Sequence, residues 1–203
     1  YYKITWSPYD LIEEYTRTAR MIEDQEIVEK DPFERIKKVR INDHEFEEFY
    51  SDGLRTLLET IDAENIEETT LRWPGHLKKM EVLRELGFFD EENVSETLDV
   101  ITPKMSYESR DFSIMDVRAE GTSDGEDMVI RYFFYDEEKN GFSSMSRCTG
   151  FTTASMVRLV LEEDVDSGVI PPEELGRDLK YHDFMVQRLQ NKGIKIEKET
   201  FHG

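Results

Sequence analysis

The chain has 203 residues, 37% of them hydrophobic and 11% aromatic, which is enough apolar material for the core of one domain or two small ones. Acidic residues dominate, since 46 Asp and Glu stand against 26 Lys and Arg and give a formal net charge of −20. This charge disfavours binding to nucleic acid or to an anionic membrane, because both attract clustered basic residues. No apolar stretch approaches the roughly 20 residues that a membrane-spanning helix needs.

Several kinds of site are disfavoured by residue counts and spacing. Cys148 is the only cysteine, so the chain has no intrachain disulfide and no Cys-rich zinc site, and it fits a reducing cytoplasm. The four histidines lie far apart without metal-ligand spacing, so we expect no metal. Neither the glycine-rich dinucleotide motif nor the phosphate-binding loop of nucleotide hydrolases is present.

The first elements are predicted from local signals. Residues 1–6 are rich in β-forming side chains and predict a strand. Ser7 and Pro8 predict a helix start, since serine is a favoured N-cap and proline fits the first helical position. The buried face of this helix is predicted to hold Leu11, Ile12 and Tyr15.

Short strands and helices follow. Strands are predicted at residues 19–22, 26–28, 36–41, 45–50 and 65–73, with a hairpin turn at Asn42-Asp43. Helices are predicted at residues 53–58, from Leu77 to Leu86, and over 94–101. Gly87 ends the second of these, and the third ends before Pro103.

The second half predicts long strands and two main helices. Residues 112–117 and 128–135 form the clearest antiparallel pair, joined by the polar segment 120–127. A helix at about 151–163 is predicted to place Ala154, Val157 and Leu161 on one face. A short helical turn after Pro171-Pro172, a helix closed by Gly193 and a strand at 194–196 complete the order, which favours an α+β fold.

Three segments carry residues that suit chemistry. In the first, Lys3–Pro8, the free N–H groups of a helix start and the ring of Trp6 suit a ligand or anion site. A strand followed by a capped helix explains the same residues equally well. In the third, residues 145–153 form a polar, glycine-containing helix entry that suits a phosphate or carboxylate, and a capped helix start is again the alternative.

The second segment, TLRWPGH at 70–76, brings Arg72, Trp73 and His76 together at a strand-to-helix turn. A fixed guanidinium suits a carboxylate, and an imidazole exchanges protons near neutral pH. The alternative is that Arg72 pairs with one of the many acids and that His76 caps the helix.

In this order the segments resemble the C-terminal catalytic and dimerisation region of the saccharopine dehydrogenase-like family, and within it the archaeal L-lysine 6-dehydrogenase type. The residues that carry the resemblance are YYKITWSPYDLIEEYTRTAR at 1–20, FYSDGLRTLLET at 49–60, TLRWPGHLKKMEVLRELGFF at 70–89, SSMSRCTGFTTA at 143–154 and GVIPPEELG at 168–176.

The resemblance implies an open mixed, largely antiparallel sheet with helices on one face, like the C-terminal domain of glyceraldehyde-3-phosphate dehydrogenase. It implies that residues 1–203 are a single substrate-binding and homodimerisation domain. NAD or NADP would be bound mainly by an N-terminal Rossmann domain absent from this chain, so the isolated fragment would be inactive. The implied reaction is oxidation of a C–N bond in lysine, saccharopine, carboxynorspermidine or a related cationic amine.

The resemblance also assigns roles to residues. Trp6, Ser7, Arg72, Trp73 and His76 would bind the substrate, with His76 the candidate for an otherwise unknown catalytic acid or base. The residues that would face the cofactor are Arg147, Thr149 and Gly150. A different class of function stays open: a binding or oligomerisation module that keeps the fold and has lost the catalysis.

Overall fold

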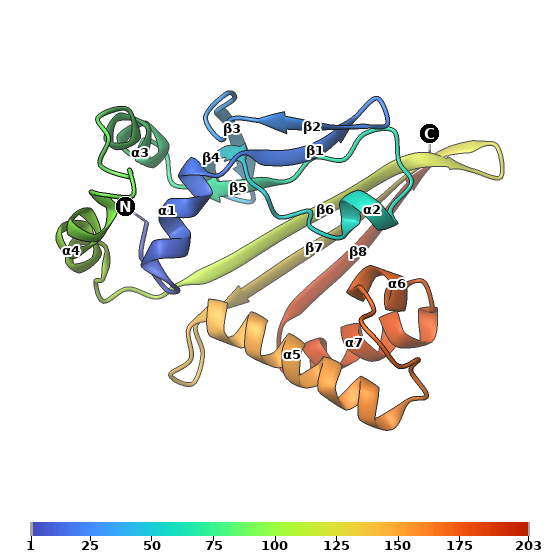
Figure 1. The fold of residues 1–203 in the computed structure, drawn as a ribbon. Coiled ribbons are helices and arrows are strands. Elements are labelled where there is room, and N and C mark those ends of the chain that lie inside the picture. Colours follow the sequence, from blue (N-terminus) through green and yellow to red (C-terminus); the bar gives the residue numbers. More distant parts are fainter. Residues whose placement is uncertain (1, 203) are drawn as a thin grey trace. The chain divides into compact units, whose positions relative to one another are not determined.

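A computed structural model gives the structure of residues 2–202. The chain divides into two compact units, Tyr1–Glu108 and Ser109–Gly203. Helices combine with three antiparallel sheets, ordered β1-β2, β3-β4-β5 and β6-β7-β8, so the predicted α+β class is confirmed (Figure 1). Among the described helices, none is both long and apolar enough to cross a membrane.

The first unit contains four helices and five strands in the described range. They are α1 (Pro8–Thr16), β1 (Ala19–Glu23), β2 (Glu26–Lys30), β3 (Lys37–Ile41), β4 (His44–Tyr50), α2 (Leu57–Thr60), β5 (Thr69–Arg72), α3 (His76–Glu85) and α4 (Val94–Met105). The predicted hairpin between β3 and β4 is confirmed, with Asn42 at φ 54° in its turn.

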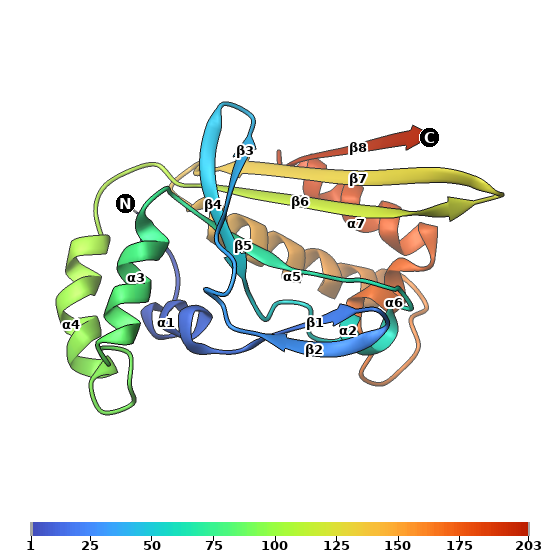
Figure 2. The ribbon, with the colours of Figure 1, turned by 90° about the horizontal axis from the view of Figure 1, so that it is seen from above.

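Helix α1 begins as the sequence predicts. The Ser7 Oγ accepts the N–H of Asp10 at 3.3 Å, and Pro8 occupies the first helical position. Leu11, Ile12 and Tyr15 are at most 2% exposed. They join a core that α3 and α4 complete, and these two helices lie side by side next to α1 (Figure 2).

Several predictions for this unit are wrong at the element ends. The helix predicted at 53–58 is found as α2 at Leu57–Thr60, and the strand predicted at 65–73 is shortened to β5 at Thr69–Arg72. Residues 2–6 form no strand, because their one backbone hydrogen bond to another element is from Ile4 N–H to the Met105 carbonyl. The side chains of Tyr2, Ile4 and Trp6 pack on the core instead. Residue 1 lies outside the described range. Helix α4 continues through Pro103, near its C-terminal end, where the missing N–H costs one bond while Met105 is buried in the core.

The second unit contains β6 (Phe112–Ser123), β7 (Glu126–Glu137), α5 (Ser144–Glu162), α6 (Pro172–Gly176), α7 (Leu179–Asn191) and β8 (Lys195–His202). The predicted pair β6 and β7 is confirmed but longer, because Asp124 and Gly125 make a tight turn with φ of 54° and 83°. The polar segment 120–127 is therefore mostly strand. Helices α5 and α7 pack on this sheet.

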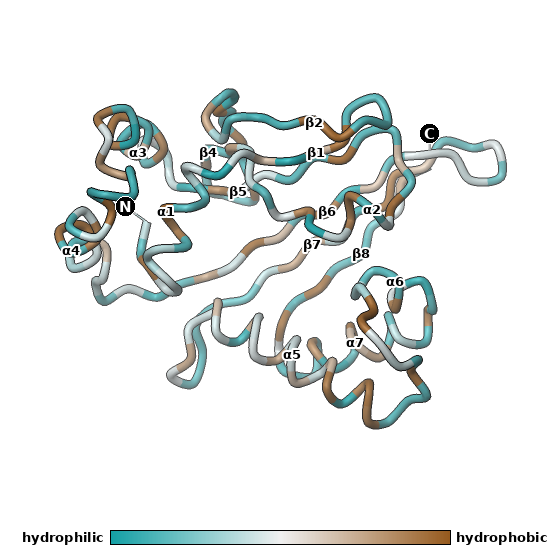
Figure 3. Tube along the Cα trace, in the orientation of Figure 1, coloured by the Kyte–Doolittle hydropathy of each residue, from teal (hydrophilic) through white to brown (hydrophobic). Residues whose placement is uncertain are grey.

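Helix α5 differs from its prediction in start and in buried face. It begins at Ser144, because the Ser143 Oγ accepts the Ser146 N–H at 3.1 Å and caps it. Its buried residues are Ser144, Arg147, Ser155 and Leu159. Ala154, Val157 and Leu161 are exposed instead, and Figure 3 shows the hydrophobic colouring of the second half of the helix.

The buried face of α5 is anchored by an ion pair. The Arg147 guanidinium donates from Nε and Nη2 to the two carboxylate oxygens of Asp136, both at 2.9 Å, and also to the Lys192 carbonyl. Ser144 adds a hydroxyl bond to the Asp136 carboxylate. Because Arg147 and Asp136 are each 4% exposed, neither charge has water to replace its partner.

We therefore expect Asp136→Ala to lower the free energy of unfolding by about 3–5 kcal/mol, since it leaves the Arg147 charge buried and unpaired. The measurement is urea unfolding of the chain. Arg158→Ala is the matched control on the same helix, because it removes an exposed pair with Glu162 and should cost about 0–1 kcal/mol. Equal losses in the two variants would contradict the prediction.

Candidate functional site

The TLRWPGH segment folds as the junction between β5 and α3. Arg72 is the last residue of β5 and His76 the first of α3, with Gly75 between them at φ +80°, a conformation that favours glycine. The Gly75 N–H donates to Glu47 Oε2 at 2.9 Å, and the Trp73 ring lies 5.0 Å from the Phe46 ring. The turn is thus held on both sides, which fixes where Arg72 and His76 project.

Arg72 is enclosed within the first unit, and each of its three guanidinium nitrogens donates a hydrogen bond. Its side chain is 5% exposed. It donates from Nε to the Tyr15 hydroxyl at 2.9 Å, from Nη1 to the Leu71 carbonyl at 2.8 Å and from Nη2 to Glu14. Its guanidinium carbon also lies 4.4 Å from the centre of the Tyr2 ring. The alternative that Arg72 pairs with an acid is therefore confirmed, and the acid is Glu14.

His76 is bonded to the same tyrosine. Its Nε2 lies 2.9 Å from the Tyr15 hydroxyl oxygen, which also accepts the Arg72 Nε–H. When the Nδ1 of His76 carries the proton, the Tyr15 O–H donates this hydrogen bond to Nε2. Burial, aided by the charges of Arg72 and Lys79, lowers the pKa of His76 to about 3. Burial raises the pKa of Tyr15 to about 12.

The pKa shift and the hydrogen bond of His76 bear on one expectation and one alternative. The lowered pKa favours a neutral imidazole at pH 7, which disfavours His76 as a proton donor. His76 does not cap α3 either, because its side chain bonds Tyr15 and Gly75 holds the N-cap position. Its role as a candidate catalytic group stays a prediction.

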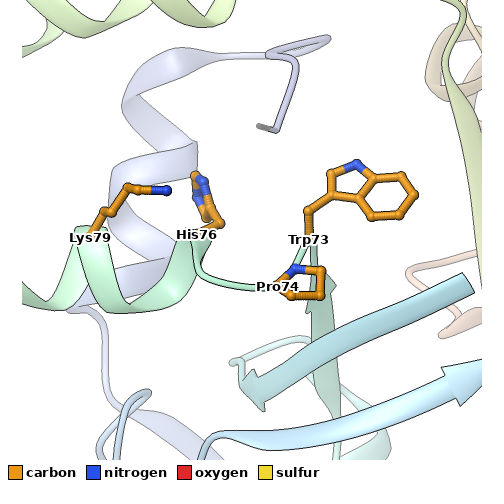
Figure 4. A pocket seen from close by; sticks show the side chains of 4 residues that line it. All are labelled: Trp73, Pro74, His76 and Lys79. Carbon is orange, nitrogen blue, oxygen red and sulfur yellow. The ribbon is translucent and has the colours of Figure 1, made fainter.

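Two cavities flank this network. One, of about 220 Å³, is lined by Trp73 and Pro74 from the β5–α3 junction and by His76 and Lys79 from the first turn of α3 (Figure 4). The other, of about 390 Å³, is lined by Trp6, Asp10, Glu13, Glu14, Arg17, Ser51, Asp52, Gly53, Arg55, Glu68 and Thr70, and we call it the acidic cavity. Ser7 and Arg72 line neither cavity. The Ser7 side chain caps α1, and the Arg72 side chain is enclosed.

The acidic cavity has five carboxylates and two arginines in its wall. Both arginines are paired, Arg17 with Glu13 and Arg55 with Asp52. Two arginines outside the wall pair with its acids as well, Arg20 with Asp52 and Arg72 with Glu14, so Asp10 and Glu68 are the wall acids that form no ion pair with a described arginine. Glu68 accepts the Ser51 hydroxyl at 2.5 Å and the Gly53 N–H at 3.1 Å, and burial raises the pKa of its carboxyl. The surplus of negative charge suits a cationic ligand.

Sequence reasoning missed Glu14, Tyr15 as a hydrogen-bonding group, and Glu68. One signal was present, since Asp10 and Glu14 are four residues apart and therefore share a face of α1. No such spacing links Glu14 to Arg72, which lies 58 residues further on. In residues 2–202, no group of three or more His, Cys, Asp or Glu is placed to hold a metal ion.

The three residues predicted to face the cofactor lie on α5 in the second unit. The Arg147 guanidinium is buried against Asp136, and the Thr149 hydroxyl donates to the Met145 carbonyl within the helix. Gly150 is inside the helix, and a Cβ there would meet nothing within 4 Å, so its backbone lines no cradle. Thr149 and Gly150 are exposed on the helix, and the role of the three residues toward a cofactor stays a prediction.

Comparison with known proteins places the chain in a family. The model of the saccharopine dehydrogenase C-terminal domain matches residues 1–194. The chain belongs to this family. No protein of curated function matches it in sequence.

A solved structure shares the fold of this family member. It is the apo histidine-tagged saccharopine dehydrogenase (L-Glu forming) from Saccharomyces cerevisiae, with a TM-score of 0.77 and 18% sequence identity. The match covers 98% of this chain and 62% of that chain. The predicted C-terminal-domain fold is thereby confirmed, and this chain spans less than two thirds of the yeast enzyme.

The depressed pKa of His76 makes stability depend on pH. An unfolded histidine takes up a proton below pH 6.5, whereas the folded one does so only near pH 3, so stability falls as the pH drops through this window. Between pH 7 and pH 5 the loss from this group is about 2 kcal/mol. Urea unfolding at both pH values should show a smaller loss for His76→Gln than for the wild type; the same loss in both would contradict the assignment.

Proposed function

We propose that this chain is the substrate-binding and dimerisation part of an NAD(P)-dependent amine or amino-acid dehydrogenase. The observation that carries the proposal is the family match over residues 1–194. The acidic cavity beside the buried Arg72 network supports it, because a cationic amine is the ligand that such a wall attracts.

The proposed reaction is oxidation of a CH–NH or CH–NH₂ donor, with lysine the first candidate, as in the archaeal L-lysine 6-dehydrogenase type. Saccharopine and carboxynorspermidine are the other candidates, and all carry protonated amines at neutral pH. Trp6 gives the cavity an apolar wall for the carbon chain, and its Nε1–H is occupied by the Tyr2 hydroxyl at 2.8 Å. The predicted contact of Arg72 with a substrate carboxylate requires Glu14 to release the guanidinium.

The proposed cofactor is NAD or NADP, bound by a Rossmann domain outside these 203 residues. When bound, the nicotinamide supplies the hydride acceptor. The proposal that the domain lies elsewhere is supported by the 62% coverage of the yeast enzyme and by the absence of a glycine-rich dinucleotide motif from this sequence. The proposed location is the cytoplasm, and the single cysteine, Cys148, supports it because reducing compartments disfavour disulfides.

The reaction is tested with the full-length protein that contains this chain, supplied with NAD or NADP and each of the three amines. We expect formation of reduced cofactor with at least one amine. The 203-residue chain alone is the matched control and should form none, because its sequence contains no glycine-rich dinucleotide motif. A full-length protein that forms none with any amine would contradict the proposal and favour the non-catalytic binding module.

We also propose that the protein is a homodimer. Strands β6 and β7 are long, and hydrophobic side chains such as Met115 and Val117 on β6 are 54% and 48% exposed, which a second copy would cover. Light scattering at micromolar concentration should therefore show twice the mass of one chain. A 24.0 kDa species alone for the 203-residue chain would reject the dimer.

A further inference from the structure

Glu14 is where the buried Arg72 network meets the acidic cavity. Its Oε2 accepts the N–H of Arg72 Nη2, and its side chain lines the cavity wall with 26% exposure. Arg72, at 5% exposure, is not part of that wall. The guanidinium therefore acts on the contents of the cavity only through the carboxylate that it holds.

Arg72 holds Glu14 in one place. The guanidinium is itself fixed by the Tyr15 hydroxyl, the Leu71 carbonyl and the face of the Tyr2 ring. Within residues 2–202, Arg72 is the only hydrogen-bond partner of the Glu14 side chain, and it uses Oε2. Oε1 is left to bond a ligand, so Glu14 is an oriented acceptor rather than a mobile surface acid.

We propose that Glu14 binds the ammonium group of the amine substrate and takes up one of its protons, with Arg72 as the positioning residue. This proposal rests on the proposed function, because it names the group that recognises and deprotonates the amine. Trp6 lines the same cavity and borders the carbon next to the charge with an apolar surface.

The step balances as a proton transfer. One N–H bond of the ammonium breaks, its proton bonds to Oε1 of Glu14, and the electron pair of the broken bond stays on nitrogen. The products are a carboxylic acid and a neutral amine whose lone pair is available for oxidation of the adjacent carbon. A protonated amine has no such lone pair, so the step must precede oxidation.

The surroundings of Glu14 suit a proton acceptor. Burial and the nearby Glu68 raise the pKa of the Glu14 carboxyl, while Arg72 opposes that rise. A raised pKa moves a carboxyl toward the range in which it accepts a proton at neutral pH. The charged and titratable groups around it are Arg72, Glu68, Tyr15, Asp10, Glu13, Arg17, Asp52 and Arg55.

A pair of ligands that differ in the terminal ammonium group tests the binding half of the proposal. L-lysine and L-norleucine have similar carbon chains, but norleucine lacks the terminal ammonium. Calorimetry with the full-length protein should show lysine binding more tightly than norleucine. Glu14→Gln should weaken lysine binding about 10- to 100-fold, the value of a charge-assisted hydrogen bond, and leave norleucine unchanged.

The control is Glu67→Gln, which removes an exposed charge paired with Arg35 outside both cavities. It should change lysine affinity less than about twofold. Wild-type protein without preference for lysine, or Glu14→Gln with the wild-type preference, would overturn the proposal.

The pH profile of kcat/KM tests the proton-transfer half. The wild type should lose activity at low pH as a carboxyl becomes protonated, and Glu14→Gln should lower kcat/KM and remove that limb. Glu14→Asp keeps a carboxylate and should restore part of kcat/KM and part of its low-pH limb. If the low-pH limb of the kcat/KM profile is unchanged in Glu14→Gln, the proposal is overturned. A wild-type protein that binds lysine but reduces no cofactor overturns only the proposed function and this proton step.

A second variant controls for loss of stability in Glu14→Gln. Glu14→Gln leaves the Arg72 charge buried without its partner, which is destabilising. The double variant Glu14→Gln with Arg72→Met removes both charges and leaves none buried alone. It should show the same loss of lysine preference, and a retained preference in this variant would equally overturn the proposal.

Discussion

The burial of one guanidinium constrains most of the first unit. A cation with 5% exposure has lost its water, so its donors must be met by protein groups whose positions are fixed. The N–H donors of Arg72 bond to Tyr15 and Glu14 on α1 and to the Leu71 carbonyl on β5. The charge ties α1 to β5, and through Tyr15 it reaches His76 on α3 and disfavours protonation of that imidazole.

The second unit contains a similar pair with a different outcome. Arg147 and Asp136 form two parallel hydrogen bonds and are both enclosed, so nothing of the pair is left for a ligand. Glu14 differs because it stands at the wall of a cavity and is engaged through one oxygen. Exposure of the acid, rather than the presence of a buried arginine, separates a structural pair from a candidate site.

The sequence predicted what depends on neighbouring residues. Ser7 and Pro8 start α1, and the i, i+4 spacing that buries Leu11 and Tyr15 is local, as is the cap that begins α5 at Ser144 and was overlooked. The strand predicted at residues 1–6 does not form in its described part, residues 2–6, because these residues have no partner strand, which sequence spacing cannot supply. Arg72 was found from its turn, but Glu14, 58 residues away, becomes its partner only through packing.

The net charge of −20 gains a more specific meaning from the acidic cavity. Salt screens acids that are exposed to solvent, so such acids select no ligand by themselves. In the cavity, Arg20 and Arg72 pair with Asp52 and Glu14 from behind the wall, and burial raises the pKa of the Glu14 and Glu68 carboxyls. Because desolvated charge is screened less than exposed charge, the proposed preference of the cavity for an amine over an anion should persist at ionic strengths where the surface charge no longer discriminates.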